Sequence, residues 1–144
     1  MKIYLDNCCF NRPFDDQSQI RIKIETEAKL KIQEDIRAGK FQLVWSYLLD
    51  YENNKNPYSD RKSQITNWKK YAIEYIVENS KLIEQANFFN QFGLQKIDSL
   101  HIACATTAKC EYYLTTDDKI LNKSNKITDI KITDLIGFIK EVLI

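Results

Sequence analysis

The chain has 144 residues, of which 44% are hydrophobic, 28% charged and 12% aromatic, with three glycines and two prolines. This composition excludes a disordered chain, a collagen-like repeat and a low-complexity linker, and it predicts one folded domain over residues 1–144. The net charge is +1, because 21 Lys and Arg face 20 Asp and Glu. No overall field draws the protein to nucleic acid or anionic lipid, so any polyanion must be bound by a local group of residues.

Targeting and cross-linking signals are absent from the sequence. The start, MKIYLDNCCFNRPF, lacks the apolar region of a secretory signal, and no stretch has the roughly 18 uninterrupted apolar residues of a membrane span. We therefore expect a cytoplasmic protein with no membrane contact. The four cysteines include no C-x-x-C pair and His101 is the only histidine, so neither disulfides nor a structural zinc site is expected.

The first part of the chain predicts a strand, a loop and a long helix. Residues 2–5 (KIYL) have the short apolar pattern of a strand, and the polar run 11–19 is typical of a loop. Apolar residues then recur every four positions from Ile20 to Ile36, which predicts an amphipathic helix that ends near Gly39.

A second strand is expected at residues 41–45 (FQLVW), and Ser46 is suited to cap the helix that carries Glu52. The polar run 53–60 predicts a second loop. The helices expected after it span 61–78, 85–92, 97–109, 119–122 and 134–144, and the strands span 81–83, 112–115 and 130–132.

This alternation of short apolar strands with helices predicts the fold class. Each crossover between parallel strands lays a helix across the sheet, so both sheet faces become covered. The expected fold is α/β: a single three-layer α/β/α domain with a central, mostly parallel sheet.

Four acids from distant segments are expected at one edge of that sheet. Helix N-termini and strand C-termini share one edge in βαβ units, and ligands bind there. Asp6 ends the first strand, Glu52 lies in the second turn of a helix, Asp98 opens another, and Asp117 follows a strand directly, with Asp118 beside it.

Each acid alone has a simpler interpretation, as a cap, a turn residue, a partner of the helix dipole or a solvated side chain. As a group, packed carboxylates repel one another unless a proton or a cation neutralises them, and oxygen ligands favour Mg²⁺ or Mn²⁺ over zinc. The chemistry that such a group indicates is metal-assisted attack by water on a phosphodiester.

The sequence resembles the PIN-domain family, which includes the VapC-like ribonuclease toxins. The resemblance runs over nearly the whole chain, through the segments KIYLDNCCFNRPF, WSYLLDYE, KIDSLHIACA, YLTTDD and IKITDLIGFI. It implies a parallel sheet between helices and four acids that form a divalent-metal nuclease site. Carried over position by position, the catalytic and metal-binding residues are Asp6, Glu52, Asp98 and Asp117.

The sequence departs from the family pattern in two places. Asn7 and Cys8 stand where the family commonly has Thr or Ser and then Asn, which changes the hydrogen bonding expected around Asp6. In the YLTTDD segment, either of the two threonines can be aligned with the family, so Asp118 stays an alternative to the favoured Asp117.

Other residues have competing interpretations. His101 lies one turn after Asp98, where it could donate a proton or contact substrate, but packing in the core is favoured and metal ligation is not. Arg12, in the loop after Asp6, is a candidate for binding substrate phosphate. Aromatic residues on the expected helices 61–78 and 85–92 predict exposed apolar surface, and together with the resemblance they favour a homodimer.

The leading functional hypothesis is a Mg²⁺- or Mn²⁺-dependent endoribonuclease that acts on RNA and is the toxin of a toxin-antitoxin pair. The alternative is a catalytically silent PIN-like module that binds RNA or a protein; metal binding and cleavage separate the two. A phosphotransfer domain of the dehalogenase type is disfavoured because the second Asp of that type, two residues after the first, is Cys8 here.

Overall fold

The computed structural model describes residues 1–144 and contains one sheet of five parallel strands, in the order β3-β2-β1-β4-β5. The strands are β1 (Lys2–Leu5), β2 (Gln42–Ser46), β3 (Ala72–Ile76), β4 (Tyr112–Leu114) and β5 (Lys131–Thr133). The α-helices are α1 (Asn7–Asn11), α2 (Ile20–Arg37), α3 (Tyr47–Asn54), α4 (Ser59–Asn67), α5 (Ser80–Asn90), α6 (Lys96–Thr107), α7 (Asp118–Leu121) and α8 (Leu135–Val142). Short 3₁₀ helices add η1 (Arg12–Phe14), η2 (Trp68–Tyr71) and η3 (Ser124–Lys126).

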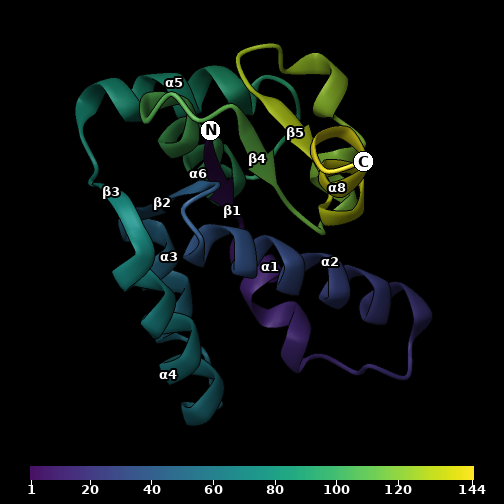
Figure 1. The fold of residues 1–144 in the computed structure, drawn as a ribbon. Helices are drawn as coiled ribbons and strands as arrows, with labels where there is room; N and C mark the ends of the chain where they lie inside the picture. The colour runs from purple at the N-terminus through teal and green to yellow at the C-terminus, as the bar shows by residue number, and fades with distance from the viewer.

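Helices cover both faces of the sheet, which confirms the expected three-layer α/β/α class. Helices α5 and α6 pack together, and α6 contacts β2 and β4, whereas α2 packs against α8 (Figure 1). The chain moves outward from β1 to β2 and β3, and then returns through α5 and α6 to β4 on the other side of β1. The order of the strands therefore reverses between β1 and β4, and ligands of parallel sheets bind at such a reversal.

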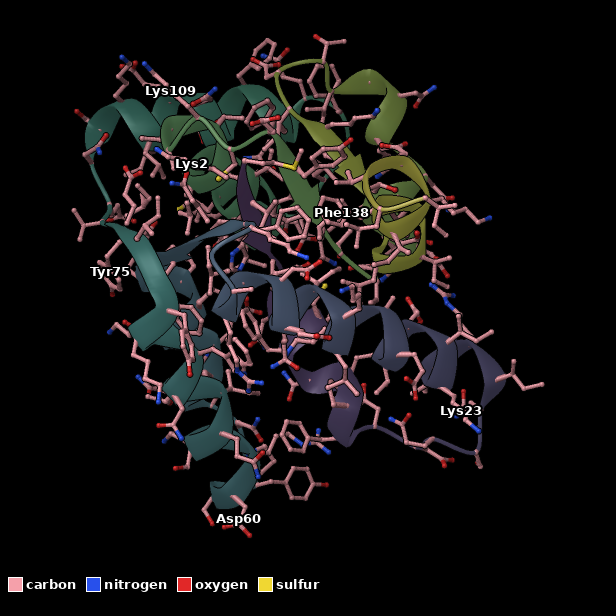
Figure 2. All side chains as sticks on the ribbon, in the orientation of Figure 1. Lys2, Lys23, Asp60, Tyr75, Lys109 and Phe138 are labelled. Carbon is pink, nitrogen blue, oxygen red and sulfur yellow. The ribbon has the colours of Figure 1, made fainter.

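The core is continuous across the sheet. The central strand β1 contributes Ile3, Tyr4 and Leu5, all fully buried, as expected for a strand covered on both faces. Phe138 of α8 packs edge-on against the ring of Tyr112 in β4, with ring centroids 4.9 Å apart (Figure 2). This packing holds the C-terminal helix on the sheet and fixes the edge formed by β4 and β5.

The third strand was predicted in the wrong place. Residues 61–78 were expected to be a helix and 81–83 a strand, but α4 ends at Asn67, β3 spans Ala72–Ile76 and α5 spans Ser80–Asn90. The segment Ala72–Ile76 (AIEYI) alternates in its exposure and pairs with β2, so partners from another segment outweigh its apparent helical spacing. Asn79 starts α5 instead, because its side-chain oxygen accepts the amide hydrogen of Leu82 at 2.9 Å.

The segment after β1 also differs from the prediction. The loop expected at residues 11–19 begins later, because α1 and η1 continue the chain in helical turns to Phe14. The predicted cap of α3 is confirmed, since Ser46 Oγ accepts the amide hydrogen of Leu49 at 3.3 Å. None of the helices combines the length and the apolar character needed to cross a membrane.

Candidate active site

Asp6 lies at the centre of the sheet edge, where β1 ends and α1 begins. Its backbone amide donates to the carbonyl of Leu114 in β4 at 2.9 Å, and its side chain is 7% exposed. One carboxylate oxygen accepts the amide hydrogen of Asn7 and the other accepts the hydroxyl of Thr115, each at 2.8 Å. Together the two bonds fix the direction of the carboxylate.

Thr115 links Asp6 to the segment after β4. Its hydroxyl oxygen also accepts the amide hydrogen of Asp117 at 3.1 Å, and the side chain is fully buried. Cys8 lies beside this contact, with its sulfur 3.5 Å from Thr115 Oγ1 and 3.3 Å from the amide nitrogen of Thr116. The cysteine that departs from the family pattern thus occupies a position next to the acids.

Asp117 and Asp118 point to different partners. Asp118 is exposed and receives two hydrogen bonds of 2.8 Å from the guanidinium of Arg21 in α2, which together with that charge lower its pKa. Asp117 caps α7 and its charge acts on Asp98. The structure therefore brings Asp117 toward the other acids and engages Asp118 in an ion pair.

Asp98 lies in the first turn of α6, where it is half-buried. Burial, followed by the negative charges of Asp6, Asp117 and Glu52, raises its pKa to about 6 against the opposing effect of His101. A pKa raised in this way is the signature of carboxylates that share one site. The charges of the other three expected acids therefore all act on Asp98.

Glu52 is held by the only histidine. His101, one turn after Asp98 on α6, is 1% exposed, and its Nε2 bonds to Glu52 Oε1. Its Nδ1 lies 2.6 Å from the hydroxyl of Tyr4, which in turn lies 2.7 Å from Ser46 Oγ. If Tyr4 donates to Nδ1, Nε2 carries the hydrogen and donates it to Glu52, so the histidine orients the acid.

The electrostatics of this contact agree with its geometry. Burial alone would lower the pKa of His101, but the hydrogen bond to Glu52 and the charges of Asp6, Glu52 and Asp98 raise it. The expected core packing of His101 is confirmed, since its ring meets that of Tyr4 edge-on with centroids 5.7 Å apart. The bond between His101 and Glu52 was not predicted from the sequence; the only indication was that His101 lies one helical turn after Asp98, beside the expected site.

The group fits a divalent cation. Ligand-type atoms of Asp6, Glu52 and His101 lie within 4.8 Å of one another. Because both ring nitrogens of His101 are engaged by Tyr4 and Glu52, the carboxylate oxygens are the donors available to a cation. None of the four acids forms an ion pair with lysine or arginine, since Glu52 pairs only with His101. Carboxylates that lie together without a lysine or arginine partner are stabilised by a hard cation, and their oxygens are the ligands it prefers.

Arg12 faces a different set of acids. Its guanidinium pairs with Asp15 at 3.1 Å and with the buried Glu25 at 3.2 Å. Arg21 completes this network through Glu25 and Asp118. A phosphate bound by Arg12, as expected from the sequence, would therefore have to compete with the carboxylates of Asp15 and Glu25 for the guanidinium.

Comparisons with known proteins give a match at the level of structure only. No model of a protein family matches the sequence, and no curated protein does. Solved structures match over almost the whole chain: VapBC2 from Rickettsia felis bound to a DNA fragment from their promoter has a TM-score of 0.60 at 14% identity and covers 93% of this chain and 98% of that one. VapBC-1 from nontypeable Haemophilus influenzae matches with a TM-score of 0.58 at 16% identity and covers 94% of this chain and 99% of that one. FitAcB from Neisseria gonorrhoeae matches with a TM-score of 0.57 at 11% identity and covers 93% of this chain and 98% of that one.

These likenesses define the class of fold. The chain has the PIN-type fold of the VapC-like structures, and the resemblance inferred from the sequence is confirmed at this level. The acidic group lies at the sheet edge between β1 and β4, where the order of the strands reverses.

Proposed function

We propose that this protein is a divalent-metal-dependent endoribonuclease in which Asp6, Glu52, Asp98 and Asp117 hold Mg²⁺ or Mn²⁺ and position the reacting groups. The observation that carries the proposal is the group of four acids without a lysine or arginine partner at the reversal of strand order. The PIN-type fold of the matching structures supports the same function.

The residues divide the work by their surroundings. A bound Mg²⁺ or Mn²⁺ would supply the Lewis acidity that activates water and neutralises the phosphodiester. Asp6 is pre-oriented by Asn7 and Thr115, and Glu52 by His101, so neither carboxylate must be ordered when the site forms. Asp98 has a pKa raised to about 6, so it holds its proton to a higher pH than an ordinary aspartate, and binding of a cation would displace that proton.

Cleavage of RNA by purified protein tests the proposal. We expect cleavage with Mg²⁺ or Mn²⁺, none with EDTA, and a loss of at least about a hundredfold in Asp98→Asn, because one ligand charge is removed at constant size. Asp118→Asn is the matched control: it removes a neighbouring charge that is engaged by Arg21 and should keep most of the activity.

Three outcomes would each contradict part of this proposal. Undiminished cleavage by Asp98→Asn, in preparations freed of contaminating ribonuclease, would remove Asp98 from the site. Binding of RNA without cleavage at any metal concentration would favour a silent RNA-binding module. If Asp118→Asn rather than Asp117→Asn were inactive, the fourth acid would be Asp118.

The partners proposed for the protein are an antitoxin and a second copy of the chain. The matching structures are those of VapBC2, VapBC-1 and FitAcB, which supports an antitoxin partner. Exposed apolar side chains on β3 and α5, namely Ile73, Tyr75 and Phe88, support a dimer, although Trp68 and Phe89 are buried and leave less aromatic surface than the sequence suggested. A monomer in sedimentation at micromolar concentration would contradict the dimer.

A further inference from the structure

A small polar cavity adjoins the acidic group on one side. It has a volume of about 300 Å³ and lies between the N-terminal end of α6 and the segment of α7. Asp98 forms part of its wall, so the cavity adjoins the acidic group through this residue. We call it the α6–α7 slot; the remaining lining residues are Gly93, Leu94, Gln95, Lys119, Asn122 and Lys123.

The two lysines of the α6–α7 slot have no acidic partner. Lys119 is exposed and its ammonium group forms no hydrogen bond or ion pair. Lys123 donates only to the backbone carbonyl of Gly93. Neither positive charge is neutralised by a carboxylate, so both can attract an anion.

Gly93 makes room for this arrangement. It has a φ of +87°, a conformation that favours glycine, and a Cβ atom built on it would lie 2.9 Å from Lys123 Nζ. The absence of a side chain thus allows the Lys123 ammonium to lie across the slot beside the backbone.

Two arginines, one in η1 and one in α2, differ from the two slot lysines in their pairing. Arg12 and Arg21 are paired with Asp15, Glu25 and Asp118. Of these four cations, only Lys119 and Lys123 have no carboxylate partner and are free to meet a phosphate.

We propose that the α6–α7 slot binds the phosphate of the nucleotide next to the cleaved bond in single-stranded RNA, through the ammonium groups of Lys119 and Lys123. The inference rests on the proposed nuclease function, which places the cleaved phosphate at the four acids. The volume of about 300 Å³ is at the small end of ligand sites, and it suits one nucleotide rather than a duplex. The exposed amides of Gln95 and Asn122 can hydrogen-bond to the ribose or the base.

Binding without cleavage tests the slot. A labelled single-stranded RNA is titrated in EDTA with protein carrying Asp6→Asn, and the dissociation constant is measured by fluorescence anisotropy over a range of salt concentrations. Adding Lys119→Ala and Lys123→Ala should weaken binding about tenfold at moderate salt and make the log–log salt dependence shallower by about 0.7, the value for one phosphate contact on a single strand.

The matched control removes two lysines elsewhere. Lys23 lies near the outer end of α2 and Lys140 on α8; both are exposed and free of carboxylate partners (Figure 2 labels Lys23). The double variant Lys23→Ala and Lys140→Ala has the same net charge as the slot variant. Its affinity for RNA should stay within about twofold of the parent protein, because only general electrostatic attraction is lost.

The outcomes separate this inference from the nuclease proposal. The proposed binding of phosphate in the slot is contradicted if the slot variant and the control variant have equal affinities for RNA. It is also contradicted if the parent protein does not bind RNA at all. Loss of RNA binding in the slot variant would support it even if the unsubstituted protein never cleaves RNA, a result that would overturn the nuclease function alone. If the unsubstituted protein cleaves RNA but the slot variant binds RNA with unchanged affinity, the phosphate-binding role of the slot is contradicted and the nuclease function is not.

Discussion

At the scale of single residues, the sequence located the acids better than their partners. Asp6 and Asp117 follow the ends of strands, so the topology alone placed them at one edge. The choice between Asp117 and Asp118 could not be made from the sequence, because it depends on Arg21, which is 97 residues from Asp118. The hydroxyl of Thr115, which holds Asp6, was missed for a similar reason, since its contact joins segments 109 residues apart.

The orientation of Glu52 gives a prediction for His101. His101→Gln keeps a polar side chain but removes the imidazole that holds Glu52, so we expect the affinity for Mn²⁺ to fall about 10- to 100-fold. Tyr4→Phe removes only the more distant link and should act in the same direction with a smaller effect. Calorimetric titration with Mn²⁺ measures the affinity of each of the two variants.

Thermal unfolding of the same variants in EDTA separates orientation from folding. If His101 only packs the core, His101→Gln lowers the melting temperature while Mn²⁺ affinity is retained by the folded protein. That result would contradict the role of His101 in orienting Glu52.

At the scale of elements, the secondary structure of segments with one periodicity of apolar residues was predicted correctly. That of a segment that combines helical spacing with a strand was not. The helix expected at 97–109 is α6, Lys96–Thr107, because its small buried side chains leave one possible arrangement against the sheet. The stretch from Ile65 to Ile76 has apolar residues at helical spacing but contains both a helix end and an edge strand. Only the pairing of β3 with β2 decides between the two, and that pairing is not local in sequence.

Helix α2 carries a buried lysine that predicts a change of stability with pH. Lys29 is 1% exposed, and its ammonium lies 5.0 Å from the ring centroid of Phe10 and 5.1 Å from that of Trp68. With the Gln33 amide turned so that its oxygen faces the neighbouring donors, that oxygen accepts from Lys29 Nζ at 2.7 Å. No carboxylate pairs with Lys29, and burial lowers its pKa to about 7, assisted by the charge of Arg37 and opposed by Cys9.

The sign follows from the depressed pKa. Between pH of about 7 and 10 the unfolded chain binds this proton and the folded protein does not, so the contribution of Lys29 to wild-type stability rises with pH over that range. Lys29→Met removes the buried charge at similar length. Its stability relative to wild type should therefore be greater at pH 6 than at pH 10 by about 2–4 kcal/mol, measured by urea unfolding.

Lys23→Met provides the control on the same helix, because Lys23 is exposed. Its effect on the free energy of unfolding should not change with pH. A difference between Lys29→Met and wild type that is constant from pH 6 to pH 10 would show that Lys29 stays protonated in the folded protein.

At the scale of the whole molecule, a net charge of +1 conceals a marked separation of charge. The four acids gather at one edge, the arginines near them are paired with other acids, and the lysines of the α6–α7 slot are not. Composition could not predict this separation, because it arises from the topology that brings β1, α3, α6 and β4 to one edge.

If the acids hold a divalent cation as proposed, we expect the stability of the folded protein to depend on that cation. The pKa of Asp98 is raised to about 6, so its contribution to the stability of the metal-free protein is full below pH of about 4 and is lost as pH rises through about 6. Mn²⁺ or Mg²⁺ should relieve this loss. At a free concentration about 100 times the dissociation constant, we expect the melting temperature at pH 7.5 to rise by about 5–10 °C.

The same cation should act less at pH 5 than at pH 7.5, because it must then displace a proton from the acids. NaCl of equal ionic strength gives screening without coordination, and should reproduce little of the rise in melting temperature. The double variant Asp6→Asn and Asp98→Asn should be more stable than wild type in EDTA, since like charges are removed, and should show no rise with Mn²⁺. An equal rise in the double variant would show that the cation binds elsewhere on the protein and would leave the acids at the sheet edge without a metal to hold.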